Sequence, residues 1–166
     1  MLPGIIVKPL KRNFDDRGSF MEIMRSDWAD LLGDDKIEQA NLSVTYPNVV
    51  RAWHKHERGQ TDYFLVVKGA AKICAYDEES MELDEIVSAA ENPQIVRIPG
   101  KYWHGFRAIG IEPVFLVYFT TRLYDYDRPD EIRRPWNDVI IPRMINGRTD
   151  DPRCNKPWDW FYPPHR

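Results

Sequence analysis

The stretch that decides the fold is Arg51-Ala-Trp-His54-Lys-His56, which is followed after six residues by the apolar run Tyr63-Phe-Leu-Val-Val67. An apolar, β-branched and aromatic run of this length predicts a buried strand. Alternate side chains of an extended strand point to the same face, so His54 and His56 are expected to share a face. The neighbouring Trp53 favours a pocket wall over a solvated surface. The stretch therefore predicts two strands that present a pair of imidazoles to a pocket.

Similar β-prone runs recur at short intervals up to residue 121. Acidic or proline-containing turns separate them, a pattern typical of a β-sandwich or barrel. The clearest helical signal is Ser26–Gly33, with Ser26 as the expected N-cap and Gly33 as the stop. We therefore expect an all-β fold with short helical turns. The expected strands span residues 4–10, 19–24, 36–44, 49–55, 62–68, 70–77, 84–88, 94–98, 102–108 and 114–121.

The length of 166 residues predicts a single domain, 1–166, with its own core. Residues 1–138 are expected to form the barrel and 139–166 an irregular C-terminal arm, because the last segment is rich in proline and tryptophan without periodicity. The 23 basic and 26 acidic residues are spread along the chain, which argues against a nucleic-acid-binding protein. No window is long and apolar enough for a membrane span. Cys74 and Cys154 form no CxxC pair, and we expect a reducing cytoplasm.

Six short motifs stand out along the chain: Asp16-Arg17-Gly18-Ser-Phe20-Met-Glu22, Gln39-Ala-Asn41-Leu-Ser43, Val50-Arg51-Ala-Trp-His54, Ile98-Pro-Gly-Lys-Tyr-Trp-His104-Gly-Phe106, Val117-Tyr118-Phe-Thr120 and Trp136-Asn-Asp138. They occur in the order that they have in one enzyme family, and together they cover roughly residues 10 to 138. The chain thereby resembles the dTDP-4-dehydrorhamnose 3,5-epimerase family, the nucleotide-sugar epimerase branch of the cupins. The resemblance implies a cupin jelly-roll barrel or β-sandwich.

The resemblance implies an isomerase that acts without a cofactor on a nucleoside-diphosphate 4-keto-6-deoxy sugar, exchanging a proton at C3, C5 or both. By their motif positions, His54 would be the base and Tyr118 the acid on a facing strand. The family forms homodimers through N-terminal strands, so residues 4–10 are expected to pair across an interface. The remaining residues implied to bind substrate are Arg17 and Arg51 at the diphosphate, and Glu22, Gln39, Asn41 and His104 elsewhere in the cleft.

The chain departs from the family at two points. Asp62 stands where the family has a lysine that helps to stabilise the enolate, and a carboxylate there would repel an enolate unless it were protonated or paired. The family's histidine-orienting aspartate lies in the C-terminal region. Asp150, Asp151 and Asp159 are equivalent candidates for that role in this sequence.

The same residues motivate an alternative function. Metal-binding cupins use an H-x-H pair, a following carboxylate and a later histidine, and His54, His56, Asp62 and His104 fill those places. Three imidazoles and a carboxylate would hold one divalent transition metal: Fe(II), Mn, Ni, Cu or Zn. This alternative is a metal-dependent dioxygenase or isomerase. A third possibility is a non-catalytic cupin that binds a nucleotide sugar as a sensor or as a subunit of a larger enzyme.

Overall fold

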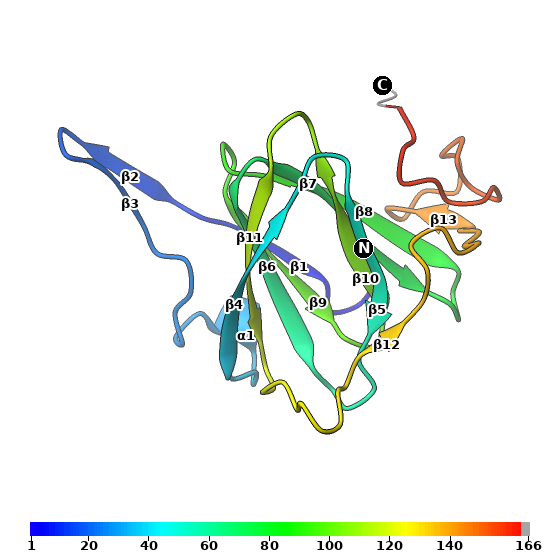
Figure 1. Cartoon of the computed structure of the whole chain (residues 1–166), viewed down its shortest axis with the longest axis horizontal. Helices are drawn as coiled ribbons and strands as arrows, with labels where there is room; N and C mark the ends of the chain where they lie inside the picture. The colour runs from blue at the N-terminus through cyan, green and yellow to red at the C-terminus, as the bar shows by residue number, and fades with distance from the viewer. Residues whose placement is uncertain (164–166) are drawn as a thin grey trace.

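The computed structural model describes residues 1–163. Two facing sheets make up the body of the protein (Figure 1). In spatial order, the five-stranded sheet consists of β1 (Ile6–Pro9), β9 (Gln94–Pro99), β6 (Thr61–Lys68), β11 (Val114–Thr120) and β4 (Gln39–Thr45). The six-stranded sheet consists of β12 (Ile132–Arg133), β5 (Val50–Lys55), β10 (Trp103–Ile109), β7 (Ala70–Asp77), β8 (Glu82–Ala89) and β13 (Met144–Ile145).

The predicted all-β fold is confirmed, although the sheets within residues 1–163 do not close into a complete barrel. All strand pairs are antiparallel except β8–β13. The main core lies between the sheets, because β6 and β11 on one side and β7 and β10 on the other turn apolar side chains inward. Its members include Phe64, Val66, Ile73, Phe106 and Leu116.

The strand β6 is buried on both of its faces, which explains its continuous apolar sequence. One face packs into the main core, and the other packs with the helix α1 (Ala29–Leu32) through Leu31 and Leu32. The prediction that Ser26 caps this helix is wrong: Trp28 occupies the N-cap without a side-chain cap. Gly33 ends the helix as predicted, with a φ of 55° that suits glycine.

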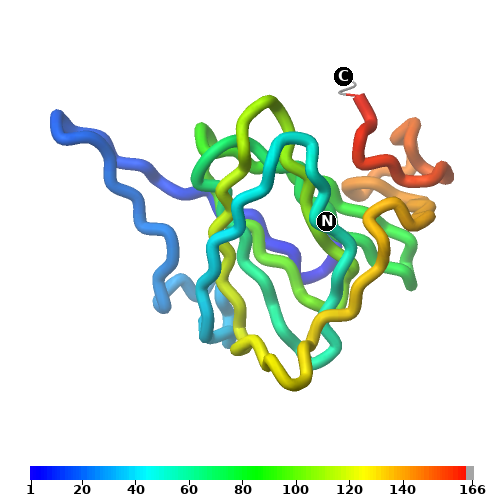
Figure 2. The backbone as a smooth tube through the Cα atoms, in the orientation of Figure 1, coloured from blue at the N-terminus to red at the C-terminus, as the bar shows by residue number. Residues whose placement is uncertain are grey.

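A two-stranded hairpin formed by β2 (Arg12–Asp15) and β3 (Gly18–Met21) projects away from the body (Figures 1 and 2). Phe14 and Phe20 are largely exposed on it. The preceding strand β1 pairs with β9 of the same chain along one of its edges and ends the five-stranded sheet. Two exposed phenylalanines on a projecting hairpin form an apolar surface that its own chain does not cover.

The C-terminal segment packs against the outer face of the six-stranded sheet (Figure 2). Its Trp158 and Trp160 join Trp53 and Trp103 in a second buried cluster, and Trp53 and Trp160 have ring centroids 4.8 Å apart. This packing explains the high aromatic content of a segment without periodicity. No helix in the described part of the chain has the length and apolar character needed to span a membrane.

Candidate active site

A cavity of about 1150 Å³ opens between the two sheets. It is lined from β4, β5, β6 and β11, and by the strap, which we define as residues 121–134. The strap runs from β11 to β12 along one end of the sheets (Figure 1). His54, on β5, and Tyr118, on β11, both line this cavity. The predicted base and acid therefore come from opposite sheets and share one cavity.

The imidazole of His54 is free to act as a base. Among the described residues it makes no hydrogen bond, and its ring centroid lies 4.2 Å from that of His104. Burial, followed by the nearby His104, holds the pKa of His54 well below its usual value. The ring is therefore neutral at neutral pH, which is the state that a proton acceptor requires.

A glycine makes the approach of the two histidine-bearing strands possible. His104, on β10, pairs in register with His54 on β5, and a bulge follows between His104 and Phe106. A Cβ on Gly105 would lie 2.4 Å from the Cβ of Ala52 and 2.5 Å from the carbonyl oxygen of Arg51. Only glycine fits there without moving one strand, because the clash involves backbone atoms.

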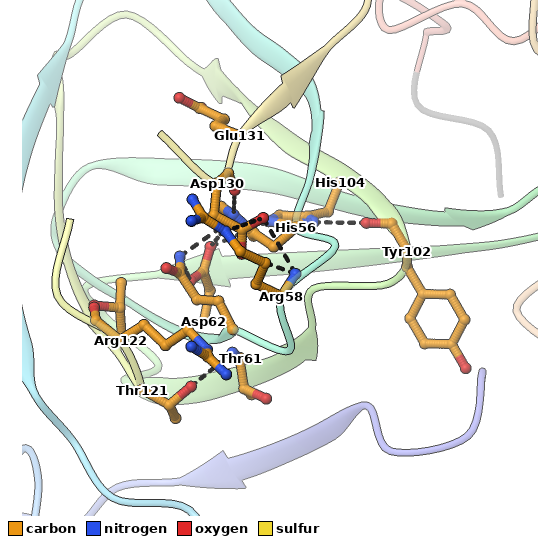
Figure 3. Close-up of polar contacts among 12 residues, drawn as sticks. His56, Arg58, Thr61, Asp62, Tyr102, His104, Thr121, Arg122, Asp130 and Glu131 are labelled. Carbon is orange, nitrogen blue, oxygen red and sulfur yellow. Dashed lines mark hydrogen bonds and ion pairs between the residues drawn. The ribbon is translucent and has the colours of Figure 1, made fainter. Parts of the chain in front are cut away.

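Asp62 lies at the centre of the polar cluster (Figure 3). Its Oδ2 is 3.1 Å from Nε2 of His104 and 3.4 Å from Nε2 of His56, while Gln60 donates to Oδ1 at 2.7 Å. Burial alone would raise the pKa of Asp62, but the hydrogen bonds with the two imidazoles outweigh it and hold that pKa well below its usual value. The carboxylate is thus ionised and paired. A carboxylate at this position would repel an enolate unless it were protonated or paired, and Asp62 is paired.

Backbone carbonyls orient the imidazoles of His56 and His104. Nδ1 of His104 hydrogen-bonds the carbonyl oxygen of Tyr102 at 2.8 Å, and Nδ1 of His56 hydrogen-bonds that of Asp130. Both Nε2 atoms consequently face Asp62. His104 is fully buried and lies behind His54 instead of on the cavity wall, so the structure does not present it directly to a substrate.

The four residues of the alternative function are brought together. One ligand atom from each of His54, His56, Asp62 and His104 lies within 4.8 Å of all the others. Imidazole nitrogens and a carboxylate oxygen suit a divalent transition metal, and the carbonyls that bind both Nδ1 atoms fix the histidines in the orientation that metal ligands adopt. The residues present therefore fit such an ion.

Three of the other predicted substrate residues reach the cavity. Gln39 and Asn41 line it from β4, with Gln39 Nε2 donating to Asn41 Oδ1 at 2.8 Å. Arg51 lines the cavity from β5, and its Nε donates to Oγ1 of Thr45, on β4, at 2.9 Å. Gln39 and Asn41 form a polar wall beside Tyr118, with which Asn41 pairs in register, while Arg51 lies on the same strand as His54.

Arg17 and Glu22 lie outside the cavity of their own chain. Arg17 is at the tip of the projecting hairpin, with its side chain 85% exposed and paired to Asp15 at 2.6 Å. Glu22 follows β3 and pairs with Arg25 at 2.6 Å. Neither residue lines the cavity between the sheets.

The three C-terminal aspartates also lie away from His54. Asp150 pairs with Arg148 and Asp151 with Arg153, and Asp159 accepts from the backbone N–H of Phe161. None of the three aspartates lines the cavity. The carboxylate inside the histidine cluster is Asp62, which comes from β6 on the opposite sheet.

Sequence reasoning missed the strap as part of the site. The carboxylate of Asp130 accepts from the backbone N–H of Glu57 at 3.0 Å and of Arg58 at 3.2 Å, in addition to the carbonyl contact with His56 (Figure 3). Glu131 and Arg133 line the cavity beside it. Only the charged, aromatic composition of this segment signalled such a role, since it has no periodicity.

The comparisons with known proteins agree with this geometry. Residues 13–132, more than half of the chain, match the family model described as the polysaccharide biosynthesis C-terminal domain. The chain is 46% identical over 136 residues to the probable low-salt glycan biosynthesis epimerase of Haloferax volcanii, covering 79% of this chain and 86% of that protein. The chain belongs to the family of the polysaccharide biosynthesis C-terminal domain. It is also 40% identical over 146 residues to the spore coat polysaccharide biosynthesis protein SpsL of Bacillus subtilis, covering 85% and 94% of the two chains.

Solved structures give the same result for the fold. NovW, a 4-keto-6-deoxy sugar epimerase from Streptomyces spheroides, superposes with a TM-score of 0.72 at 25% identity, over 82% of this chain and 72% of that one. The dTDP-6-deoxy-D-glucose-3,5-epimerase from Legionella pneumophila superposes with the same TM-score at 22% identity, over 83% and 76%. The resemblance to sugar epimerases that the motifs indicated is confirmed.

Proposed function

We propose that this family member is an isomerase that epimerises a nucleoside-diphosphate 4-keto-6-deoxy sugar at C3, C5 or both. The single observation that carries the proposal is that His54 and Tyr118, on opposite sheets, line one cavity. The 46% identity to a probable glycan biosynthesis epimerase supports it. A base and an acid on opposite walls can remove a proton from one face of the sugar ring, which leaves a flat enolate, and return a proton to the other face.

The two side chains have the protonation states that this reaction needs. His54 is neutral and free of hydrogen bonds within the described chain, so it can accept the proton next to the C4 ketone. Burial, and then the charge of Asp62, raise the pKa of Tyr118, so its phenol keeps its proton at neutral pH. Phe64 packs edge-on against Tyr118, with ring centroids 6.1 Å apart, and helps to hold the phenol in place.

Tyr118→Phe tests the acid. In deuterated water, we expect the variant to exchange the first proton at nearly the parental rate but to form epimerised product about 10²-fold or more slowly, because protonation from the opposite face loses its donor. NMR of a 4-keto sugar nucleotide measures both rates in one sample. Formation of epimerised product at the parental rate would show that Tyr118 is not the acid.

We further infer a homodimer. The hairpin carries the exposed Phe14 and Phe20 away from the body of its own chain, and Arg17 lies outside the cavity of its own chain. Both observations favour a contact between the hairpin and a second copy of the chain. Sedimentation velocity should give a mass of about twice 19.6 kDa, and a monomer at micromolar concentration would contradict it.

The free, buried thiols of Cys74 and Cys154 support a cytoplasmic location.

A second candidate function rests on the histidine cluster. The ligand atoms of His54, His56, Asp62 and His104, all within 4.8 Å, favour a metal-dependent cupin, either a dioxygenase or an isomerase. A bound ion would supply Lewis-acid chemistry beside the cavity. This candidate leaves the polar wall of Gln39 and Asn41 without a function.

Elemental analysis separates the two candidates. We expect protein purified without chelators to contain much less than one equivalent of any transition metal, and dialysis against a chelator to leave proton exchange unchanged. One tightly bound equivalent that is lost in both His56→Ala and Asp62→Ala would favour the metal-dependent function instead.

A further inference from the structure

Arg133 is a charged residue of the cavity for which the proposed reaction supplies no role. It lies on β12 and pairs in register with His54 of β5. Its side chain lines the cavity and is 75% exposed, with Glu131, two residues earlier, accepting from it at 2.6 Å. An exposed ion pair of this kind contributes little energy, so the guanidinium is available to an anionic ligand.

The backbone around Arg133 is held firmly. Next to it, Arg134 N donates to the carbonyl oxygen of Trp53 at 3.0 Å, and Trp53 N donates to that of Arg134 at 3.2 Å. The side chain of Arg134 is used structurally, because it pairs with Glu78 and Asp138 and lies over the ring of Trp103. Arg133 is therefore a cation at the cavity on a fixed backbone, and a ligand would have to order only its side chain.

Arg51 supplies a second guanidinium on the same cavity. Its contacts are with neutral acceptors, Thr45 Oγ1 at 2.9 Å and the carbonyl oxygen of Val44 at 3.4 Å, so no carboxylate offsets its charge among the described residues. The charge of Arg51 acts on Tyr118, and that of Arg133 acts on His54. Arg51 lies on the same strand as His54 and Arg133 pairs in register with His54, so both cations come from the sheet that carries the base.

We propose that Arg133, together with Arg51, binds the diphosphate of the nucleotide-sugar substrate and thereby places the sugar ring between His54 and Tyr118. Two planar guanidinium groups match the oxygens of a diphosphate better than ammonium groups do. This inference rests on the proposed function and gives that function a binding residue within its own chain, since Arg17 lies outside the cavity.

Calorimetric titration with dTDP and with UDP tests the inference. We expect Arg133→Gln to weaken the binding of both nucleotides by ~10- to 100-fold, the loss typical of a charge-assisted hydrogen bond. The affinity of Arg133→Lys should lie between those of the parent and Arg133→Gln, since lysine keeps the charge but lacks the planar, two-pronged donor geometry of a guanidinium. Arg148→Gln is the matched control: Arg148 also pairs with a carboxylate two residues away and is 66% exposed, but it lies outside the cavity.

Binding of both nucleotides by Arg133→Gln within twofold of the parent would overturn the inference, and so would an equal loss in Arg148→Gln. Thermal unfolding should be unchanged in Arg133→Gln, because the side chain is exposed. Deuterium incorporation into a 4-keto sugar nucleotide by the parent is measured alongside. If the parent exchanges while Arg133→Gln binds normally, this inference fails and the proposed function stands; if the parent neither binds nor exchanges, both fail.

Discussion

Replacing His54 by asparagine is expected to lower solvent-deuterium incorporation at C3 or C5 of a 4-keto sugar nucleotide by about 10²–10⁴-fold. The loss follows because His54 is the neutral imidazole on the cavity wall, with no hydrogen bond to another described residue. Asparagine keeps a polar side chain but cannot accept a proton at neutral pH. NMR in deuterated water measures the rate directly.

The control for this variant is nucleotide binding. Because Arg51 and Arg133 remain in place, calorimetry should show dTDP bound to His54→Asn with nearly the parental affinity. A variant that binds the nucleotide and still exchanges at the parental rate would rule out His54 as the base. A variant that loses binding and exchange together would show that His54 acts on substrate positioning instead.

Replacing Asp62 by asparagine is expected to reduce the free energy of unfolding by about 3 kcal/mol, because removing one partner of a buried charged cluster leaves the others uncompensated. Asp62 is 2% exposed and contacts His104, His56 and Gln60. Urea denaturation at pH 7 measures the change. Asp150→Asn, at an exposed ion pair, is the matched control and should leave stability unchanged within the error of the measurement.

The effect of Asp62→Asn should depend on pH in one direction. The pKa of Asp62 is lowered in the folded protein, so its stabilising contribution is fully present above the unfolded value of about 3.9 and is lost as pH falls toward the folded value. The difference between variant and parent should therefore persist at pH 7 and shrink below about pH 4. Adding a chelator should not alter it. If the chelator removes the difference, Asp62 stabilises the protein as a metal ligand.

Much of the fold could be predicted because its signals are local. The run Tyr63–Val67 is apolar enough to identify a strand buried on both faces, and the structure extends that strand to Thr61–Lys68. Gly33 ends the helix as its backbone freedom predicts, whereas Ser26 does not cap it. The cap depends on where the helix begins, and tertiary packing of Leu31 and Leu32 decided this more than the local preference of serine did.

The site was predictable only where a motif fixed both residue type and strand. Motif order placed His54, Tyr118, Gln39 and Arg51 on strands that meet at the cavity. The pairing of Asp62 was not predictable, since it joins β6 to His104 on the opposite sheet, 42 residues later in the chain.

The strap and the hairpin escaped prediction for a related reason. The strap is positioned by hydrogen bonds that Asp130 accepts from a loop distant in sequence, and no periodicity in the sequence indicates such contacts. The direction in which the hairpin carries Arg17 depends on the two residues that join β1 to β2, and the motif around Arg17 does not include them.

The most direct measurement is solvent-deuterium incorporation by the parental protein, free of added metal, into a nucleoside-diphosphate 4-keto-6-deoxy sugar. We predict deuterium at C3, C5 or both, with an inverted centre in the product, and incorporation about 10²-fold or more slower in His54→Asn. A parent that leaves both positions unlabelled while its cavity binds the nucleotide would contradict proton transfer between His54 and Tyr118.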